Sequence, residues 1–160
     1  FSDKSSVLVT GMLHYPDLDC FLHDVFKGLS FRDKAALVGS FGEMIGSMHA
    51  LNIYHADLKA CNIKIDTKAQ RFYLLDTDRV RQGHVIGYTK RLRNLVQINT
   101  SIPVHVSRSM RMRFLKSYAG YTGDDRKTLF RDVWKISAGK EILYCTPDGD
   151  RTDSWRCSRT

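Results

Sequence analysis

The chain has 160 residues, of which 42% are hydrophobic and 11% aromatic, enough to build the core of one domain and too many for a disordered chain. Its formal net charge is +8, and the positive charge is concentrated in residues 79–140, which hold 14 Lys and Arg against three Asp. No apolar run approaches the roughly 20 residues that span a bilayer, and no signal-peptide pattern occurs, so the sequence predicts a soluble or peripheral protein.

The four cysteines show neither CxxC spacing nor the clustering of a disulfide framework; they are Cys20, Cys61, Cys145 and Cys157. This usage favours a reducing compartment and argues against structural zinc. We therefore expect a cytoplasmic location.

The first half of the chain predicts a strand followed by two helices. SSVLVTGML at residues 5–13 is a β-branched apolar run typical of an interior strand. Because the chain starts with Phe1 rather than Met and reaches this run within a few residues, we expect it to be the later part of a larger protein. Residues 15–30 show helical spacing of apolar side chains, which predicts a short helix. Residues 30–52 predict a long buried helix that begins after Ser30 as its N-cap.

The long helix contains three glycines, Gly39, Gly42 and Gly46, in the string GSFGEMIG. The spacing is not GxGxxG and no strand precedes it, so a phosphate-binding loop is disfavoured. The glycines fall on one helix face, where they predict close packing against a neighbour.

Beyond residue 52 the periodicity changes. NIKID and FYLLD are short strand-like runs joined by TKAQR, so residues 62–79 predict a β-hairpin. Three further helices are predicted from apolar spacing within residues 89–102, 107–120 and 124–140, the last with Asp124 or Asp125 at its start.

The segment YHADLKACNIKI at residues 54–65 has the residue types that phosphoryl transfer from ATP requires. The reaction needs a carboxylate to orient the acceptor hydroxyl and take its proton, a cation near the moving phosphoryl group, and oxygen ligands for Mg²⁺. Asp57 is the candidate base, Lys59 the candidate phosphate contact and Asn62 a neutral magnesium ligand. Asp76 follows the second strand of the predicted hairpin, which would return a carboxylate to the loop as a second magnesium ligand.

The pattern H-x-D-x-K-x-x-N, followed by a strand, a turn, a strand and Asp, is typical of the catalytic core of the protein-kinase-like fold. The alternative is an ordinary polar turn, capped by Asp57 and Asn62, with His55 in the core and Asp76 and Asp78 starting a loop. We favour the kinase interpretation because the motif lies between a long helix and a hairpin. It predicts an α+β fold, with a mainly helical C-terminal lobe that carries the catalytic loop and the small hairpin.

Within that fold, four strings together resemble the bacterial lipopolysaccharide kinase family, whose members phosphorylate heptose or Kdo sugars of the inner core. The strings are HADLKACNIKI, FYLLDTDRVR, RLRNLVQINTSI and RMRFLKSYAG. The resemblance runs from about Val7 to about Ile136. DTDR at residues 76–79 matches the D-x-D-R sequence of that family, where protein kinases have D-F-G.

The resemblance implies a role for each site residue. Asp57 is expected to be the catalytic base, and Lys59 is expected to contact phosphate. Asn62 and Asp76 are expected to bind magnesium, so that the cofactors are ATP and Mg²⁺.

The resemblance also implies a hinge at TGML, residues 10–13, where backbone groups around Met12 would hold adenine. Asp78 and Arg79 are expected to order the metal loop, and Asp78 is a further candidate ligand.

Because the match begins at the hinge, the glycine-rich strand and the strand lysine of the N-terminal lobe are missing from this chain. We therefore expect residues 1–140 to be a kinase-like C-terminal lobe that is inactive alone, and residues 141–160 to form a mobile tail.

The expected partner is the lipopolysaccharide core glycolipid as acceptor, and the basic region favours an anionic membrane surface at the inner face of the cytoplasmic membrane. No nucleic acid is expected. Two alternatives are an atypical protein Ser/Thr kinase and an aminoglycoside- or choline-type phosphotransferase. A protein kinase would be expected to show D-F-G and A-P-E, and neither string occurs. A third is a non-catalytic basic binding module, which no nucleic-acid motif supports.

Overall fold

The computed structural model describes residues 13–146 and 149–154. In chain order its helices and strands are α1 (Leu18–Asp24), α2 (Phe31–Ala50), β1 (Ile53–His55), β2 (Ile63–Asp66), β3 (Arg71–Leu74), β4 (Val80–Gln82), α3 (Tyr88–Asn99), α4 (Arg108–Thr122), α5 (Arg126–Ser137), β5 (Glu141–Thr146) and β6 (Gly149–Ser154). Short 3₁₀ turns occur at η1 (Phe26–Gly28), η2 (Ala60–Asn62) and η3 (Thr77–Arg79). The strand predicted at residues 5–13 lies, apart from Leu13, outside the described residues.

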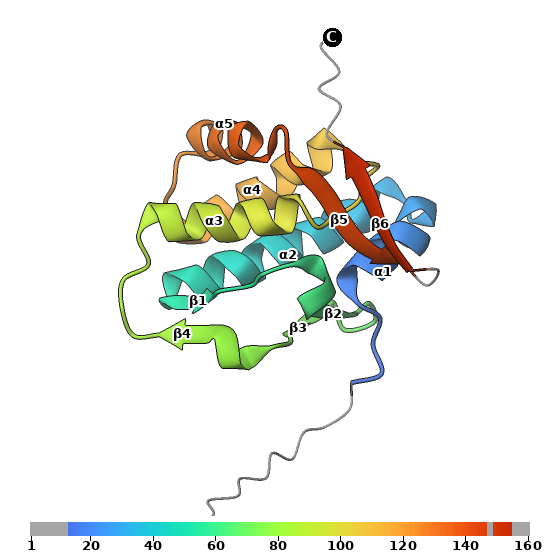
Figure 1. Ribbon diagram of the computed structural model, residues 1–160, viewed down its shortest axis with the longest axis horizontal. Coiled ribbons are helices and arrows are strands. Elements are labelled where there is room, and N and C mark those ends of the chain that lie inside the picture. The colour runs from blue at the N-terminus through green and yellow to red at the C-terminus, as the bar shows by residue number, and fades with distance from the viewer. Residues whose placement is uncertain (1–12, 147–148, 155–160) are drawn as a thin grey trace, which may run out of the picture.

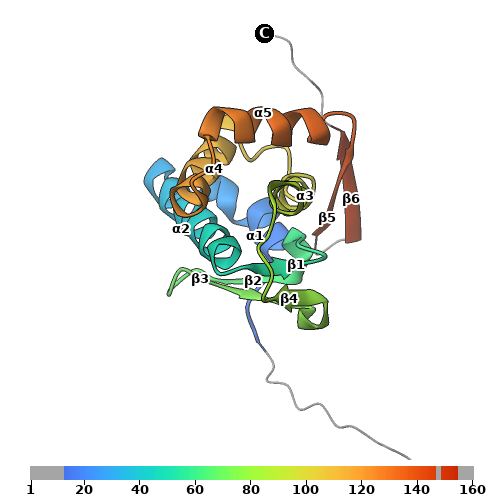
Figure 2. The ribbon, with the colours of Figure 1, turned by 90° about the vertical axis from the view of Figure 1, so that its left-hand side faces the viewer.

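Helices and small sheets occupy different parts of the molecule. Figures 1 and 2 show α2, α3, α4 and α5 stacked together, with β1 to β4 along one edge of the stack and the β5–β6 hairpin at another. Each sheet has two antiparallel strands, paired as β1 with β4, β2 with β3, and β5 with β6. The α+β class predicted from the sequence is confirmed.

The long helix α2 begins where its cap predicts. The Ser30 hydroxyl accepts a hydrogen bond from the Asp33 amide at 3.1 Å, which satisfies one of the amides that the first turn leaves without a helical partner. The predicted glycine face is also confirmed, because Gly42 and Gly46 lie against the backbone of α4. A Cβ on Gly42 would collide with the carbonyl oxygen of Phe114.

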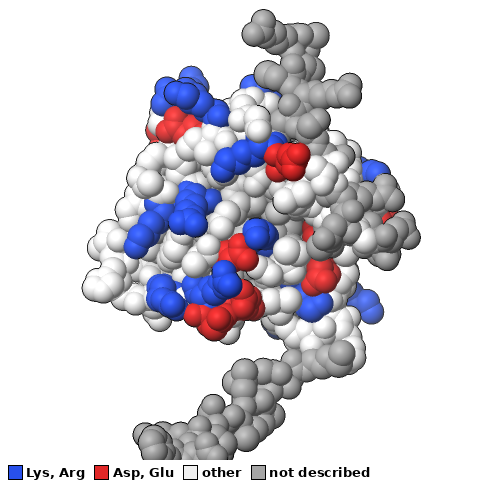
Figure 3. Space-filling model, in the orientation of Figure 1, with Lys and Arg blue, Asp and Glu red and all other residues white. Residues whose placement is uncertain are grey.

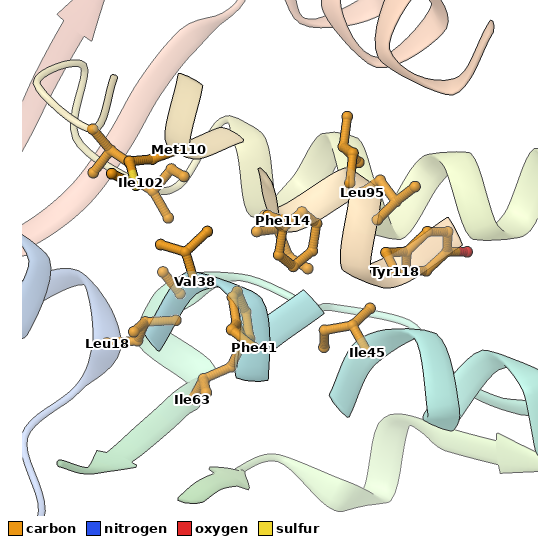
Figure 4. Close-up of a cluster of buried hydrophobic side chains, with 14 of the residues drawn as sticks. Leu18, Val38, Phe41, Ile45, Ile63, Leu95, Ile102, Met110, Phe114 and Tyr118 are labelled. Carbon is orange, nitrogen blue, oxygen red and sulfur yellow. The ribbon is translucent and has the colours of Figure 1, made fainter. Parts of the chain in front are cut away.

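The core lies between α2 and α4 and extends to α3, α1 and β2. Figure 4 shows side chains of α2 facing side chains of α4, with Leu95 of α3 beside them. Val38, Phe41 and Ile45 follow the helical spacing that the sequence predicts, and Ile45 is fully buried. This packing fixes the helices that support the strands and loops at the edge.

The predicted hairpin over residues 62–79 is confirmed as β2 and β3. Its register pairs Ile63 with Leu74 and Asp66 with Arg71. The turn closes through the Asp66 carboxylate, which accepts hydrogen bonds from the amides of Lys68 and Ala69 at 3.0 and 3.1 Å. The register brings residue 62, before β2, beside residue 75, after β3.

The segment expected to form a tail differs from the expectation, because residues 141–154 contain the paired strands β5 and β6. Ile142 is fully buried, and the amide of Leu143 donates to the carbonyl of Thr100 at 3.1 Å. The ring of Tyr144 lies 5.8 Å from that of His23 in α1. The apolar alternation of this stretch is too weak to predict a strand. Backbone pairing, the burial of Ile142 and contacts with α1 and the end of α3 hold the strand in place.

Candidate active site

The Asp57 loop, defined as residues 55–62, brings together three of the predicted site residues. Lys59 Nζ lies 3.0 Å from Asp57 Oδ1, and Asn62 Nδ2 donates to Asp57 Oδ2 at 3.3 Å and to the Asp57 carbonyl at 2.9 Å. The side chain of Asp57 is 22% exposed and that of Lys59 is 50% exposed. The carboxylate is thus held on two sides and still faces solvent.

The electrostatics of the loop favour an ionised Asp57. Burial alone would raise the pKa of this carboxyl, but the hydrogen bond and charge of Lys59, the Asn62 amide and the charge of Arg79 outweigh burial and lower it. Asp57 is therefore a carboxylate at neutral pH.

His55 ties the loop to the residue that precedes Asp76. It is fully buried, and its Nδ1 accepts a hydrogen bond from the Asp57 amide at 3.2 Å. Its Nε2 therefore carries the proton, which it donates to the Leu75 carbonyl at 2.8 Å. The Leu75 amide in turn donates to the Asn62 carbonyl at 2.8 Å. These bonds fix the place where the chain leaves β3, immediately before Asp76.

The Asp76 segment, defined as residues 75–79, has an unusual backbone. Asp76 adopts a left-handed conformation with φ 56° and ψ 47°, which aspartate tolerates better than most residues. Its carboxylate Oδ2 lies 3.2 Å from Arg79 Nε. A hydrogen bond that the protonated Asp76 carboxyl donates to the neighbouring Asp78 carboxylate, together with desolvation and the charge of Asp78, raises the pKa of Asp76.

The oxygen donors of Asn62, Asp76 and Asp78 fit a hard divalent cation. Within the part of the chain that the structure describes, no group of three His, Cys, Asp or Glu side chains is arranged to hold a metal ion alone. Both hydrogen bonds of the Asn62 side chain use Nδ2, which leaves Oδ1 as an oxygen ligand. The carboxylates of Asp76 and Asp78 repel each other, and a cation relieves that repulsion. Two carboxylates and an amide suit Mg²⁺ when nucleotide phosphates complete its coordination.

Sequence reasoning missed two features that hold the Asp57 loop. One is the pairing of β1 with β4, in which His55 lies opposite Val80. The pairing extends one residue further, because the Ala56 amide donates a hydrogen bond to the Arg79 carbonyl at 3.0 Å. The other is the set of polar side chains that α3 and its end present to the loop, namely Asn94, Gln97 and Ser101. Their spacing of three and four residues, inside an apolar helix face, is the signal that could have found them.

The described residues bring Asp57, Lys59, Asn62 and Asp76 to one end of the β2–β3 hairpin. Met12 lies outside them. No helix within residues 13–146 and 149–154 has both the length and the apolar composition to cross a bilayer.

The positive charge of residues 79–140 is distributed over several elements. Figure 3 shows lysine and arginine side chains over the face that carries α3 and α5, separated by uncharged surface and accompanied by acidic side chains. Lys90 and Arg93 are exposed on α3, and Arg131 and Lys135 are exposed on α5.

Comparisons with known proteins bear on the family and the fold of the chain. The model of the lipopolysaccharide kinase (Kdo/WaaP) family matches residues 2–139. A solved structure, WaaP in complex with acyl carrier protein, is similar with a TM-score of 0.63 and 22% sequence identity, over 79% of this chain and 54% of that chain. This chain therefore spans about half the length of that protein, and the likeness confirms the kinase-like fold. No curated protein matches the chain significantly. Because the family model covers most of the sequence, the chain belongs to the lipopolysaccharide kinase (Kdo/WaaP) family.

Proposed function

We propose that this chain carries the phosphoryl-transfer residues of an ATP- and magnesium-dependent kinase whose acceptor is a hydroxyl of heptose or Kdo in the lipopolysaccharide inner core. The observation that carries the proposal is the convergence of Asp57, Lys59, Asn62 and Asp76 at one end of the hairpin. Membership of the family supports the choice of acceptor.

Asp57 is the base in this proposal. Its lowered pKa keeps it ionised near neutral pH, so that it accepts a hydrogen bond from the acceptor hydroxyl. The hydroxyl proton passes to Asp57 as the oxygen bonds to phosphorus and the bond to the leaving ADP oxygen breaks. Lys59 is half exposed, which allows its ammonium group to contact the transferred phosphate.

Asn62 and Asp76 are the proposed magnesium ligands, and Asp78 lies beside Asp76. Magnesium, when bound, neutralises charge on the transferred phosphoryl group. Arg79 pairs with Asp76, and Arg81 donates to the Asp78 carbonyl at 2.7 Å, so both arginines order this segment. Adenine contacts through the backbone around Met12 belong to the proposal as an implication of the family resemblance.

The proposed acceptor carries phosphate and sits at a membrane. The exposed cations on α3 and α5 favour phosphate groups and anionic lipid headgroups, which supports action at the inner face of the cytoplasmic membrane.

The proposal is tested by offering competing acceptors to the full-length protein encoded by the gene. The protein is incubated with Mg²⁺ and γ-labelled ATP, and with lipopolysaccharide lacking core phosphate, a mixture of proteins, or an aminoglycoside. Label is expected in the lipopolysaccharide alone, on a heptose or Kdo residue by mass spectrometry. Label in protein or aminoglycoside would contradict the acceptor, and salt-dependent binding to duplex DNA without any transfer would contradict the kinase.

The metal ligands are tested separately with two matched variants on the same hairpin. Asp76→Asn is expected to raise the Mg²⁺ concentration at half-maximal rate at least about tenfold, because it removes a charged ligand. Asp66→Asn serves as control, since an asparagine oxygen can still accept the turn hydrogen bonds. Equal magnesium dependence in the two variants would remove Asp76 from the ligand set.

A further inference from the structure

Polar side chains of α3 and of the turn that follows it contact the Asp57 loop. Asn94 and Gln97 are three residues apart and so share a face of α3, and Ser101 lies in the turn after the helix, while Leu95 and Ile98 beside them are buried in the core. Asn94 is fully buried and Ser101 is 4% exposed. Burying an amide and a hydroxyl costs free energy unless each makes hydrogen bonds, so the partners of these groups reveal what they do.

Gln97 bridges the two peptide groups on either side of Asp57. Its Nε2 donates to the Ala56 carbonyl at 3.1 Å, and its Oε1 accepts from the Leu58 amide at 3.3 Å. One side chain thus holds the backbone before and after the proposed base. The contact fixes the direction in which the Asp57 side chain leaves the loop.

Asn94 supports both the loop and Gln97. Its Nδ2 donates to the His55 carbonyl at 2.7 Å and to Gln97 Oε1 at 2.8 Å. At the other end of the loop, the Ala60 amide donates to Ser101 Oγ at 2.9 Å. Backbone groups of residues 55, 56, 58 and 60 therefore bond to side chains of α3 and the turn that follows it.

The amide of Asn94 is itself fixed from the core. Its Oδ1 accepts from His49 Nε2 at 3.0 Å, and His49 Nδ1 accepts from the Tyr118 hydroxyl at 2.9 Å. These bonds leave a single orientation for the Asn94 amide, with its donors toward the loop.

We propose that Gln97, oriented by Asn94, is a positioning residue that aligns Asp57 for phosphoryl transfer. The proposal rests on the proposed function for the role of Asp57. The clamp, defined as the two hydrogen bonds of Gln97 to Ala56 and Leu58, rests on the structure alone. Neither residue touches the reacting atoms. Their effect is on the backbone that carries the base, and displacements of about 1 Å in such positions can cost about a hundredfold in rate.

The test compares Gln97→Met with wild type in the full-length protein. Methionine has nearly the shape of glutamine and removes both loop hydrogen bonds. We expect kcat to fall about 10- to 100-fold while KM for ATP changes less than about threefold, because the magnesium ligands keep their places. Amide hydrogen exchange at Leu58 is expected to accelerate, since this amide loses its acceptor.

Two variants on α3 with the same substitution separate positioning from stability. Asn94→Leu removes the support of Gln97, whereas Asn99→Leu removes a buried amide that bonds to Ser137 and Arg111 instead of the loop. Both are expected to lower the unfolding temperature, but only Asn94→Leu is expected to lower kcat, measured below the unfolding transition. If Gln97→Met fails to fold, Gln97→Glu replaces it, because its carboxylate keeps the acceptor for Leu58 and loses the donor to Ala56.

The outcomes distinguish the clamp from the proposed function. Unchanged kcat in folded Gln97→Met, or equal loss of kcat in Asn99→Leu, would overturn the positioning role. If wild-type protein transfers no phosphoryl group, the proposed function fails, and the exchange rate at Leu58 alone decides whether Gln97 holds the loop. Unaltered exchange in the variant would then overturn the clamp.

Discussion

Mild acid is expected to destabilise this protein through His49. This side chain is 3% exposed, and burial is the main cause that lowers its pKa from 6.5 to about 4. The charge of Arg91 acts in the same direction, while the hydrogen bond to Asn94 and the charge of Asp124 oppose it. Protonation would also remove the acceptor that Nδ1 offers to the Tyr118 hydroxyl.

The sign and size of the effect follow from linkage between protonation and folding. Between pH 6.5 and about 4, His49 is largely protonated in the unfolded chain and largely neutral in the folded chain. The unfolded state therefore binds more protons, and the free energy of unfolding falls as the pH falls. The difference in pKa corresponds to roughly 3 kcal/mol in total, of which about 2 kcal/mol is lost between about pH 7 and about pH 4.5.

Urea unfolding followed by circular dichroism at these two pH values measures the effect, with His49→Gln as the comparison. Glutamine stays neutral throughout, and all other titrating groups are common to both proteins. The free energy of unfolding of wild type is expected to fall by about 2 kcal/mol more than that of the variant. Equal losses in the two proteins would refute the assignment of this acid sensitivity to His49.

Three further predictions concern stability and are measured by the same unfolding assay. Gly42→Ala is expected to cost about 1 to 3 kcal/mol because its Cβ meets the Phe114 carbonyl, whereas Gly120→Ala, which has open space, should gain up to about 1 kcal/mol; similar changes would contradict the packing account. Ser30→Ala should cost about 1 kcal/mol through loss of the α2 cap, and no loss would contradict the cap. Arg111→Met should cost at least about 3 kcal/mol, because the buried guanidinium donates to several backbone carbonyls, and a loss below about 1 kcal/mol would contradict that role.

Local patterns predicted much of the fold. The Ser30 cap, the apolar stripe of α2 and the glycine face each depend on residues a few positions apart in the sequence. They can therefore be predicted without knowledge of the rest of the molecule. The hairpin that returns Asp76 to the Asp57 loop is likewise a short-range feature. The hairpin that brings the candidate site residues together could therefore be predicted from the sequence.

Features that depend on distant partners could not be predicted in this way. Strands β1 and β4 have three residues each and pair across more than twenty residues of chain, so neither shows a pattern of its own. Gln97 is chemically unremarkable until the fold places it beside Ala56 and Leu58. Strand β5 is held by contacts with α1 and with the carbonyl of Thr100. These partners are distant in sequence, so the sequence of the segment itself does not predict the strand.

Asp57 is the proposed base for phosphoryl transfer to a lipopolysaccharide sugar. The decisive measurement is the rate at which full-length protein moves label from γ-labelled ATP to lipopolysaccharide lacking core phosphate, for wild type, Asp57→Asn and the hairpin control Asp66→Asn. Asp57→Asn is expected to lower kcat by about 10²- to 10⁴-fold, while Asp66→Asn is expected to stay within about twofold of wild type. Transfer by Asp57→Asn at the wild-type rate would contradict the role of Asp57 as the base.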